Sequence, residues 1–173
     1  MRTLIITLAI TSILASCSTK EVKPEKSTIV FENNAEIDEW APIQSIKQVP
    51  NAHSGKFVSV IDSVAPYGLG ISKSFKEIGN QQTDSVLFNF WIFVKNINTD
   101  AKTICDIVDP TGKDIQWMGV PIKDKVKEAN KWIEIKEVFK MPANINKENY
   151  IKLFVMNTSK DEILIDDIRI TFY

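Results

Sequence analysis

This chain of 173 residues has little histidine and cysteine and no excess of positive charge. It has one histidine and two cysteines, too few for the ligand spacings of a zinc finger or for a histidine-rich metal site. Any Ser–His–Asp or Cys–His mechanism would have to use His53, so hydrolysis of that kind is disfavoured. The 21 basic and 22 acidic residues give a net charge of −1, which argues against a nucleic-acid partner. With 44% hydrophobic residues, the chain fits one globular domain with its own core, and this composition favours a non-catalytic domain.

The apolar run near the N-terminus is too short to span a membrane. Arg2 precedes this run, which extends from Leu4 to Ala15, whereas a transmembrane helix needs about 20 residues. One positive charge followed by a short apolar run is typical of a secretory signal. Residues 1–16 are therefore predicted to be a signal peptide rather than a part of the fold.

Leu14-Ala15-Ser16-Cys17 resembles the lipobox of bacterial lipoproteins. In such lipoproteins the small residues give a peptidase access to the backbone, and the cysteine thiol accepts diacylglycerol and becomes the mature N-terminus. The resemblance implies that Cys17 is the lipid anchor, with acyl chains such as palmitate. Because each buried CH₂ group contributes about 0.8 kcal/mol, several chains make the anchor effectively permanent. An ordinary signal peptide with an incidental cysteine is the alternative.

Residues 17–27 are predicted to be the acylated cysteine and a flexible tether. The segment after Cys17 is polar and charged, contains Pro24, and has little apolar surface to bury. Ser18 stands directly after the cysteine, where an inner-membrane retention signal would have aspartate. We therefore expect a location in the cell envelope at the outer membrane, with the periplasmic or the surface side left open.

Apolar and polar residues alternate along most of residues 28–173. In 86–94 every second residue is apolar, and this period of two is typical of a strand. Short strands separated by turn residues predict an all-β sandwich or barrel, and only 124–130 has the pattern of a helical turn. Because 86–94 is apolar on both faces, we expect a central strand covered on its outer side by a loop or a ligand. The other expected strands are 28–32, 57–62, 71–75, 133–135, 151–155 and 164–172.

Five short motifs are spread in order over nearly all of residues 28–173. They are Phe31-Glu32 with Trp40, Ala52-His53-Ser54-Gly55-Lys56-Phe57, Leu87-Phe88-Asn89-Phe90-Trp91-Ile92, Lys131-Trp132 with Phe139-Lys140-Met141-Pro142, and Ile165-Asp166-Asp167-Ile168. Together these motifs resemble carbohydrate-binding modules of families 4 and 9, which belong to the galactose-binding-like superfamily. The resemblance implies a jelly-roll β-sandwich of two antiparallel sheets. It says less about the ligand, because this fold carries many binding functions.

In that family a structural calcium ion often joins the first and last strands, and the resemblance implies one such ion here. The positions that match its ligands are Glu32, the backbone carbonyl of Lys56, and Asp166. Calcium takes about six to eight oxygen ligands, which carboxylates and carbonyls supply. The alternative is that Glu32 and Asp166 only form hydrogen bonds to turns.

Carbohydrate sites in jelly rolls use aromatic rings to stack on sugar rings, and polar side chains to bind the hydroxyls. Tyr67 and Trp117 are the best candidates, since both lie near glycine in segments that we expect to be exposed. Trp91 and Asn89, on the outer face of the central strand, and Gln116 complete the predicted glycan site. The alternative is that these rings only cover the ends of the sandwich.

Other residues with notable chemistry are expected to be structural. Trp40 and Trp132 are predicted to pack in the core, where the family buries an aromatic residue. His53 is expected to be a turn residue. Cys105 stands at an alternating position and is expected to be a small buried hydrophobe. No disulfide is expected, because Cys17 serves as the anchor.

Glycosidases need two carboxyl groups, and Asp106, Asp109 and Asp114 cluster around a Pro-Thr-Gly turn. A solvated turn has little means to raise the pKa of a carboxyl group, so an enzyme is the least favoured interpretation. The sequence instead predicts a non-catalytic lipoprotein of the bacterial cell envelope that binds a polysaccharide or oligosaccharide. The main alternative is an accessory module of an envelope complex, whose aromatic residues contact a partner protein and bind no sugar.

Overall fold

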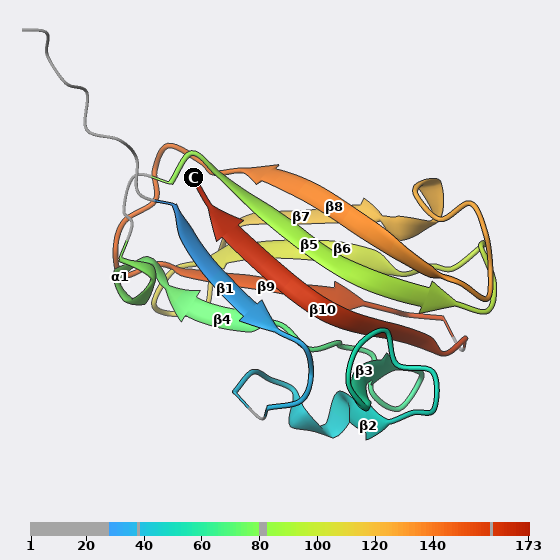
Figure 1. Ribbon diagram of the computed structural model, residues 1–173. Helices are drawn as coiled ribbons and strands as arrows, with labels where there is room; N and C mark the ends of the chain where they lie inside the picture. The colour runs from blue at the N-terminus through green and yellow to red at the C-terminus, as the bar shows by residue number, and fades with distance from the viewer. Residues whose placement is uncertain (1–27, 38, 80–82, 160) are drawn as a thin grey trace, which may run out of the picture.

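The alternating apolar residues of the chain form two antiparallel sheets that pack face to face (Figure 1). This computed structural model describes residues 28–37, 39–79, 83–159 and 161–173. The prediction of an all-β sandwich with two antiparallel sheets is confirmed. The predicted signal peptide 1–16 and the predicted anchor and tether 17–27 lie outside the described residues.

The larger sheet has six strands in the order β2-β3-β10-β5-β8, with β1 also paired to β10. Its strands are β1 (Ile29–Asn33), β2 (Ile46–Gln48), β3 (Phe57–Ile61), β5 (Ser85–Val94), β8 (Trp132–Lys140) and β10 (Ile163–Phe172). β3 pairs with 163–165 of β10 and β1 with 168–172, so the two strands occupy the same edge of β10 in succession. Where these halves meet, the register of β10 against β5 shifts between Asp166 and Arg169.

The smaller sheet has four strands in the order β4-β9-β6-β7. Its strands are β4 (Ile71–Ser74), β6 (Lys102–Val108), β7 (Asp114–Pro121) and β9 (Tyr150–Met156). Three short helical segments lie in the connections: η1 (Ile43–Ser45), α1 (Phe75–Ile78) and η2 (Ile122–Asp124). None of the helices within the described ranges has the length and hydropathy needed to cross a membrane.

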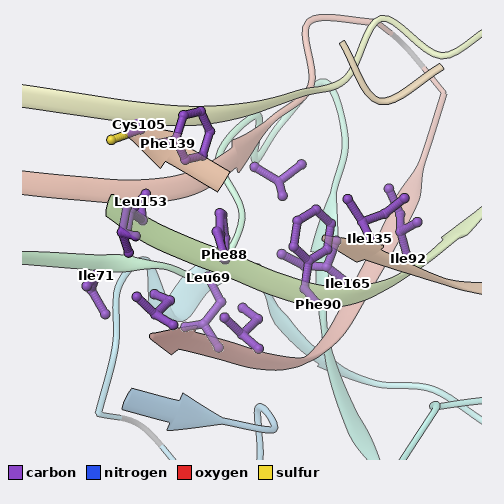
Figure 2. Close-up of a cluster of buried hydrophobic side chains, with 14 of the residues drawn as sticks. Leu69, Ile71, Phe88, Phe90, Ile92, Cys105, Ile135, Phe139, Leu153 and Ile165 are labelled. Atoms are coloured by element: carbon purple, nitrogen blue, oxygen red, sulfur yellow. The ribbon is translucent and has the colours of Figure 1, made fainter. Parts of the chain in front are cut away.

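The core lies between the sheets and is built from the inward-facing half of each strand. Phe88 and Phe90 of β5 have no exposed surface, and Figure 2 shows them among apolar side chains of both sheets. Each fully buried side chain of this kind contributes roughly 1.5–3 kcal/mol to folding. Trp40 belongs to this core, as predicted. Cys105 is fully buried, also as predicted, and this burial raises the pKa of its thiol.

The helical turn lies elsewhere than predicted. In place of a turn over 124–130, η2 ends at Asp124, and the expected strand 71–75 stops one residue early because α1 begins at Phe75. Ser74 Oγ accepts a hydrogen bond from the Glu77 backbone N–H at 3.2 Å, and Glu77 Oε2 accepts one from the Ser74 N–H at 2.8 Å. This capping box, Ser-x-x-Glu, is visible in the sequence and identifies the helix start.

Candidate functional site

The five predicted glycan-binding residues do not converge on one site. Tyr67 and Trp117 lie on the outer face of the four-stranded sheet, whereas Trp91 and Asn89 lie on the outer face of the six-stranded sheet. Gln116 is paired with the buried Ile107, so it is directed to the core side, and its Nε2 donates to Met118 Sδ at 3.1 Å. Neighbouring residues of a strand point to opposite faces, which separates Gln116 from Trp117.

The outer side of the four-stranded sheet carries exposed aromatic residues, among them Tyr150 of β9, which is 39% exposed. Tyr67, 51% exposed, meets Phe154 of β9 edge to face, with ring centroids 5.8 Å apart. Trp117 of β7 is 50% exposed, which is unusual for so large a ring. We refer to Tyr67, Phe154 and Trp117 as the aromatic face. Phe154 was not among the predicted residues, although the alternation along 151–155 indicates its outward position.

A shallow apolar groove of about 170 Å³ adjoins Tyr67. Pro42, Gly70 and Phe154 contribute to its lining, and Lys152 adds a charged group. Gly70 leaves no room for a side chain, because a Cβ there would lie 2.1 Å from the carbonyl oxygen of Leu153. The glycine therefore keeps the groove open beside Tyr67.

An ion pair joins β9 and β6, the two middle strands of the four-stranded sheet, on the side that carries the aromatic face. Lys152 Nζ of β9 is 3.1 Å from Asp106 Oδ2 of β6, and in the register Asp106 stands opposite both Lys152 and Trp117. Asp106 is 9% exposed, and its Oδ1 has no hydrogen-bond partner among the described residues. An ammonium donor and a carboxylate acceptor between aromatic rings match what a sugar ring offers: apolar faces and hydroxyls.

The outer side of Trp91 is covered by a loop, one of the two covers expected for this strand. His53 stacks on the indole with centroids 3.9 Å apart and planes 18° apart, and its Nδ1 is 2.5 Å from Asp167 Oδ2. His53 therefore links a loop to the sheet in addition to the turn role predicted for it.

Trp132 is half-buried on the same outer face as Trp91, where its Nε1 donates to the Asn51 carbonyl at 2.9 Å. Trp132 packs against a second, smaller cluster of buried residues, Val58, Val60 and Leu164. The core position predicted for it therefore holds for this outer cluster and not for the interior between the sheets.

Asn89 is held by the neighbouring strand. Its Nδ2 donates to Glu134 Oε1 at 2.9 Å and to the Ile135 carbonyl at 3.3 Å. A hydrogen bond from Lys136 and a smaller contribution from the Asn89 hydrogen bond hold the pKa of Glu134 below its usual value. This carboxylate therefore stays charged. A charged acceptor and an amide therefore stand side by side on the outer face of the six-stranded sheet.

The acidic residues expected to bind calcium have other partners in the structure. The carboxylate of Glu32 forms an ion pair with Arg169, and the carboxylate beside Lys56 belongs to Glu36 instead. Glu36 Oε1 accepts hydrogen bonds from the backbone N–H groups of Lys56 and Phe57 at 2.6 and 2.8 Å, and these bonds lower its pKa. In the described ranges, no three acidic, histidine or cysteine side chains are grouped to hold a metal ion.

Asp166 has a structural role in the same region. Its two carboxylate oxygens accept hydrogen bonds from the backbone N–H groups of Ser54, at 3.0 Å, and Asp167, at 2.8 Å. Burial raises the pKa of Asp166 to about 6. Asp166 therefore hydrogen-bonds a turn, as in the alternative interpretation, and the calcium ion stays a prediction.

The acidic turn has the features of a structural turn. Asp109 Oδ1 accepts hydrogen bonds from the hydroxyl and N–H of Thr111 and from the N–H of Lys113, and these bonds lower the pKa of Asp109. Asp106 lies within β6 and is paired with Lys152, away from the exposed Asp114 at the start of β7. The lowered pKa of Asp109 is the opposite of what a general acid needs.

No known family model and no curated protein matches the chain. Solved structures with a similar fold include the CBM22-1 xylan-binding domain of Paenibacillus barcinonensis Xyn10C. That domain is 16% identical with a TM-score of 0.51, over 82% of this chain and 92% of that chain. Another is the C-terminal family 22 carbohydrate-binding module of Clostridium thermocellum Xyn10B. That module is 12% identical with a TM-score of 0.50, over 86% of this chain and 97% of that chain.

These likenesses concern the fold. The predicted jelly-roll β-sandwich is confirmed, and its structural neighbours are carbohydrate-binding modules. The particular resemblance to families 4 and 9 stays a prediction, since the modules named above belong to family 22.

Proposed function

We propose that this protein is a non-catalytic glycan-binding module whose aromatic face binds a polysaccharide chain. The observation that carries this proposal is the pair of half-exposed rings, Tyr67 and Trp117, on one sheet face with the Lys152–Asp106 ion pair in the register between them. Large exposed rings are costly unless a ligand covers them, and sugar rings stack on such surfaces.

The positions of the two rings favour a chain of several sugars over a single sugar. Tyr67 pairs with Met156 of β9 on the side of β4, while Trp117 lies on β7 at the other edge of the sheet. Three strand spacings of about 4.8 Å separate these positions across the sheet. The glycan class to test first is xylan, since the CBM22-1 domain named above is described as xylan-binding.

The proposed place of action is the outer membrane of a bacterial cell. The lipobox-like segment that ends in Cys17 supports a lipid anchor, and the polar residues after it supply a tether. In this arrangement the protein holds a polysaccharide close to the envelope, either on the periplasmic side or at the surface.

Affinity electrophoresis in gels that contain xylan or other neutral polysaccharides tests the proposed function. We expect retardation of the wild type, and a loss of at least tenfold in affinity for Trp117→Ala and for Tyr67→Ala, because each removes a stacking ring. Tyr173→Ala is the matched control, since Tyr173 is 42% exposed and lies at the C-terminus, outside the aromatic face. If both variants are retarded as strongly as the wild type, the aromatic face does not bind the polysaccharide. An envelope protein that co-purifies in stoichiometric amount through the aromatic face would favour the protein-interaction alternative.

A further inference from the structure

A second groove lies on the opposite side of the sandwich, on the outer face of the six-stranded sheet. There β1, β10 and β5 run side by side (Figure 1). The groove has a volume of about 530 Å³, larger than the groove beside Tyr67. We name it the polar groove; its lining includes Glu32, Asn33, Asn89, Trp91, Asp167 and Arg169.

The backbone of β10 is irregular where it borders the polar groove. Between Asp166 and Arg169 the strand shifts its register against β5, and Asp167 has a φ of +46°. Asp167 is held there by His53 and by the hydroxyl of Ser54, which donates to Asp167 Oδ1 at 2.7 Å. Non-glycine residues in this conformation cost free energy and cluster at ligand sites, and bulges re-aim side chains beside such sites.

The charges of the polar groove are of both signs. Arg169 forms an ion pair with Glu32, and both side chains remain more than half exposed. Asp167 adds a second carboxylate, and Asn89 stands opposite Arg169 in the register. Two carboxylates disfavour an anionic ligand, and the guanidinium disfavours a cation. Hydroxyl groups both donate and accept hydrogen bonds, so a neutral polyol satisfies this set.

An aromatic ring completes the lining. Trp91 supplies apolar surface to the groove, and the stacked His53 fixes its indole. An aromatic ring among convergent polar groups is the usual composition of a sugar site.

We propose that the polar groove binds one neutral sugar ring, either a free monosaccharide or the end of a glycan chain. Its residues lie on the other sheet from the aromatic face, so the two sites are independent. The inference relies on the proposed function only for the class of ligand. The protein then binds a chain along one sheet and a terminal or free sugar on the other.

Two tryptophan indole N–H signals in NMR spectra of the ¹⁵N-labelled protein report the two sites separately. The probes are xylose, glucose, galactose and xylohexaose. We expect at least one monosaccharide to shift the signals of Trp91 and of the Asn89 side chain while the Trp117 signal stays in place. Shifts by xylohexaose but by no monosaccharide in the polar groove would indicate the end of a chain as the ligand and would still support the site.

Arg169→Gln is the decisive variant, and Lys95→Gln is its matched control. Both substitutions remove the cation of an exposed pair with glutamate, but Lys95 and Glu162 lie just beyond the ends of β5 and β10, outside the groove. We expect Arg169→Gln to weaken the sugar affinity at least tenfold and Lys95→Gln to leave it unchanged. Sugar shifts confined to Trp117, or equal affinity in both variants, would overturn the proposal.

Trp117→Ala separates the two proposals. If it abolishes polysaccharide retention while the Trp91 signal still responds to the sugar, the sites are independent, as proposed. If Trp117→Ala also abolishes the response of the Trp91 signal to the sugar, only one site exists and the proposed site in the polar groove is wrong. If the wild type binds no polysaccharide while its Trp91 signal responds to a sugar, the proposed function alone is rejected.

Discussion

The indole of Trp117 lies across Gly119, two residues along the same face of β7. A Cβ at Gly119 would stand 2.4 Å from Cη2 of the indole, so the ring occupies the space that any other residue would fill. This relationship places the six-membered ring of the half-exposed indole over Gly119 on the outer side of the four-stranded sheet.

Gly119→Ala therefore tests whether the orientation of the Trp117 ring matters for binding. Because the far end of a side chain gives way easily, we expect the ring to move and the free energy of unfolding to change by less than about 1 kcal/mol. Retardation in polysaccharide gels should fall toward that of Trp117→Ala. Wild-type retardation in Gly119→Ala would show that the ring position seen here is not needed.

Gly70→Ala is expected to destabilise the fold, because its Cβ would meet a backbone atom. The nearest atom is the Leu153 carbonyl oxygen at 2.1 Å, and a strand cannot move away as a side chain can. We expect a loss of about 2–3 kcal/mol in the free energy of urea unfolding. Gly112→Ala is the control, since no atom lies within 4 Å of its Cβ and only its φ of +87° opposes alanine, at about 1 kcal/mol. An equal loss in the two variants would contradict the close approach at Gly70.

Asp166 is expected to make the stability of the wild type depend on pH. Burial raises its pKa from 3.8 to about 6, so the folded state binds the proton more tightly than the unfolded state. The ionised form therefore costs stability, and the wild type should lose stability relative to Asp166→Asn as pH rises from about 4 to about 6. Urea unfolding of both proteins across this range measures the difference, in which titrations common to both cancel. A difference that stays constant with pH would contradict the buried charge.

Chelation tests the calcium ion that the family resemblance implies. Since Glu32 pairs with Arg169 and both Asp166 oxygens accept backbone N–H groups, we expect excess EDTA to leave the Tm unchanged. A fall in Tm that added calcium reverses would contradict this expectation and would return Asp166 to the list of ligands.

Cys17→Ser tests the lipid anchor. We expect the wild type to incorporate labelled palmitate and to fractionate with membranes, and the variant to lose both properties, because serine has no thiol to accept the lipid. Cys105→Ser is the control, since Cys105 is fully buried in the domain. Membrane fractionation of Cys17→Ser with no label in the wild type would reject the anchor.

Much of the architecture could be predicted from local pattern. The period of two in 86–94 identified β5, and its two apolar faces predicted the cover that the His53 loop provides. The helix start at Ser74 was missed although its capping box is local and legible. Trp132 packs in the outer cluster and not between the sheets. The sequence could not tell the two apart, because a period of two tells which residues share a face but not which face meets the main core.

The candidate site depended on more than the pattern. Phe154 was passed over because nothing in the sequence says that it meets Tyr67, 87 positions earlier. Likewise, no local signal brings Arg169 to Glu32, or Asp167 to His53.

The sequence by itself determined that this chain folds into extended strands with alternating burial, because side-chain direction along a strand follows from local backbone geometry. It also determined the N-terminal segment from which a lipid anchor is inferred. Only the tertiary structure decided which rings lie together, separating Tyr67 and Trp117 from Trp91 and Asn89 onto opposite outer faces. Strand pairing joins residues far apart in the chain, and that pairing is set by how the whole core packs.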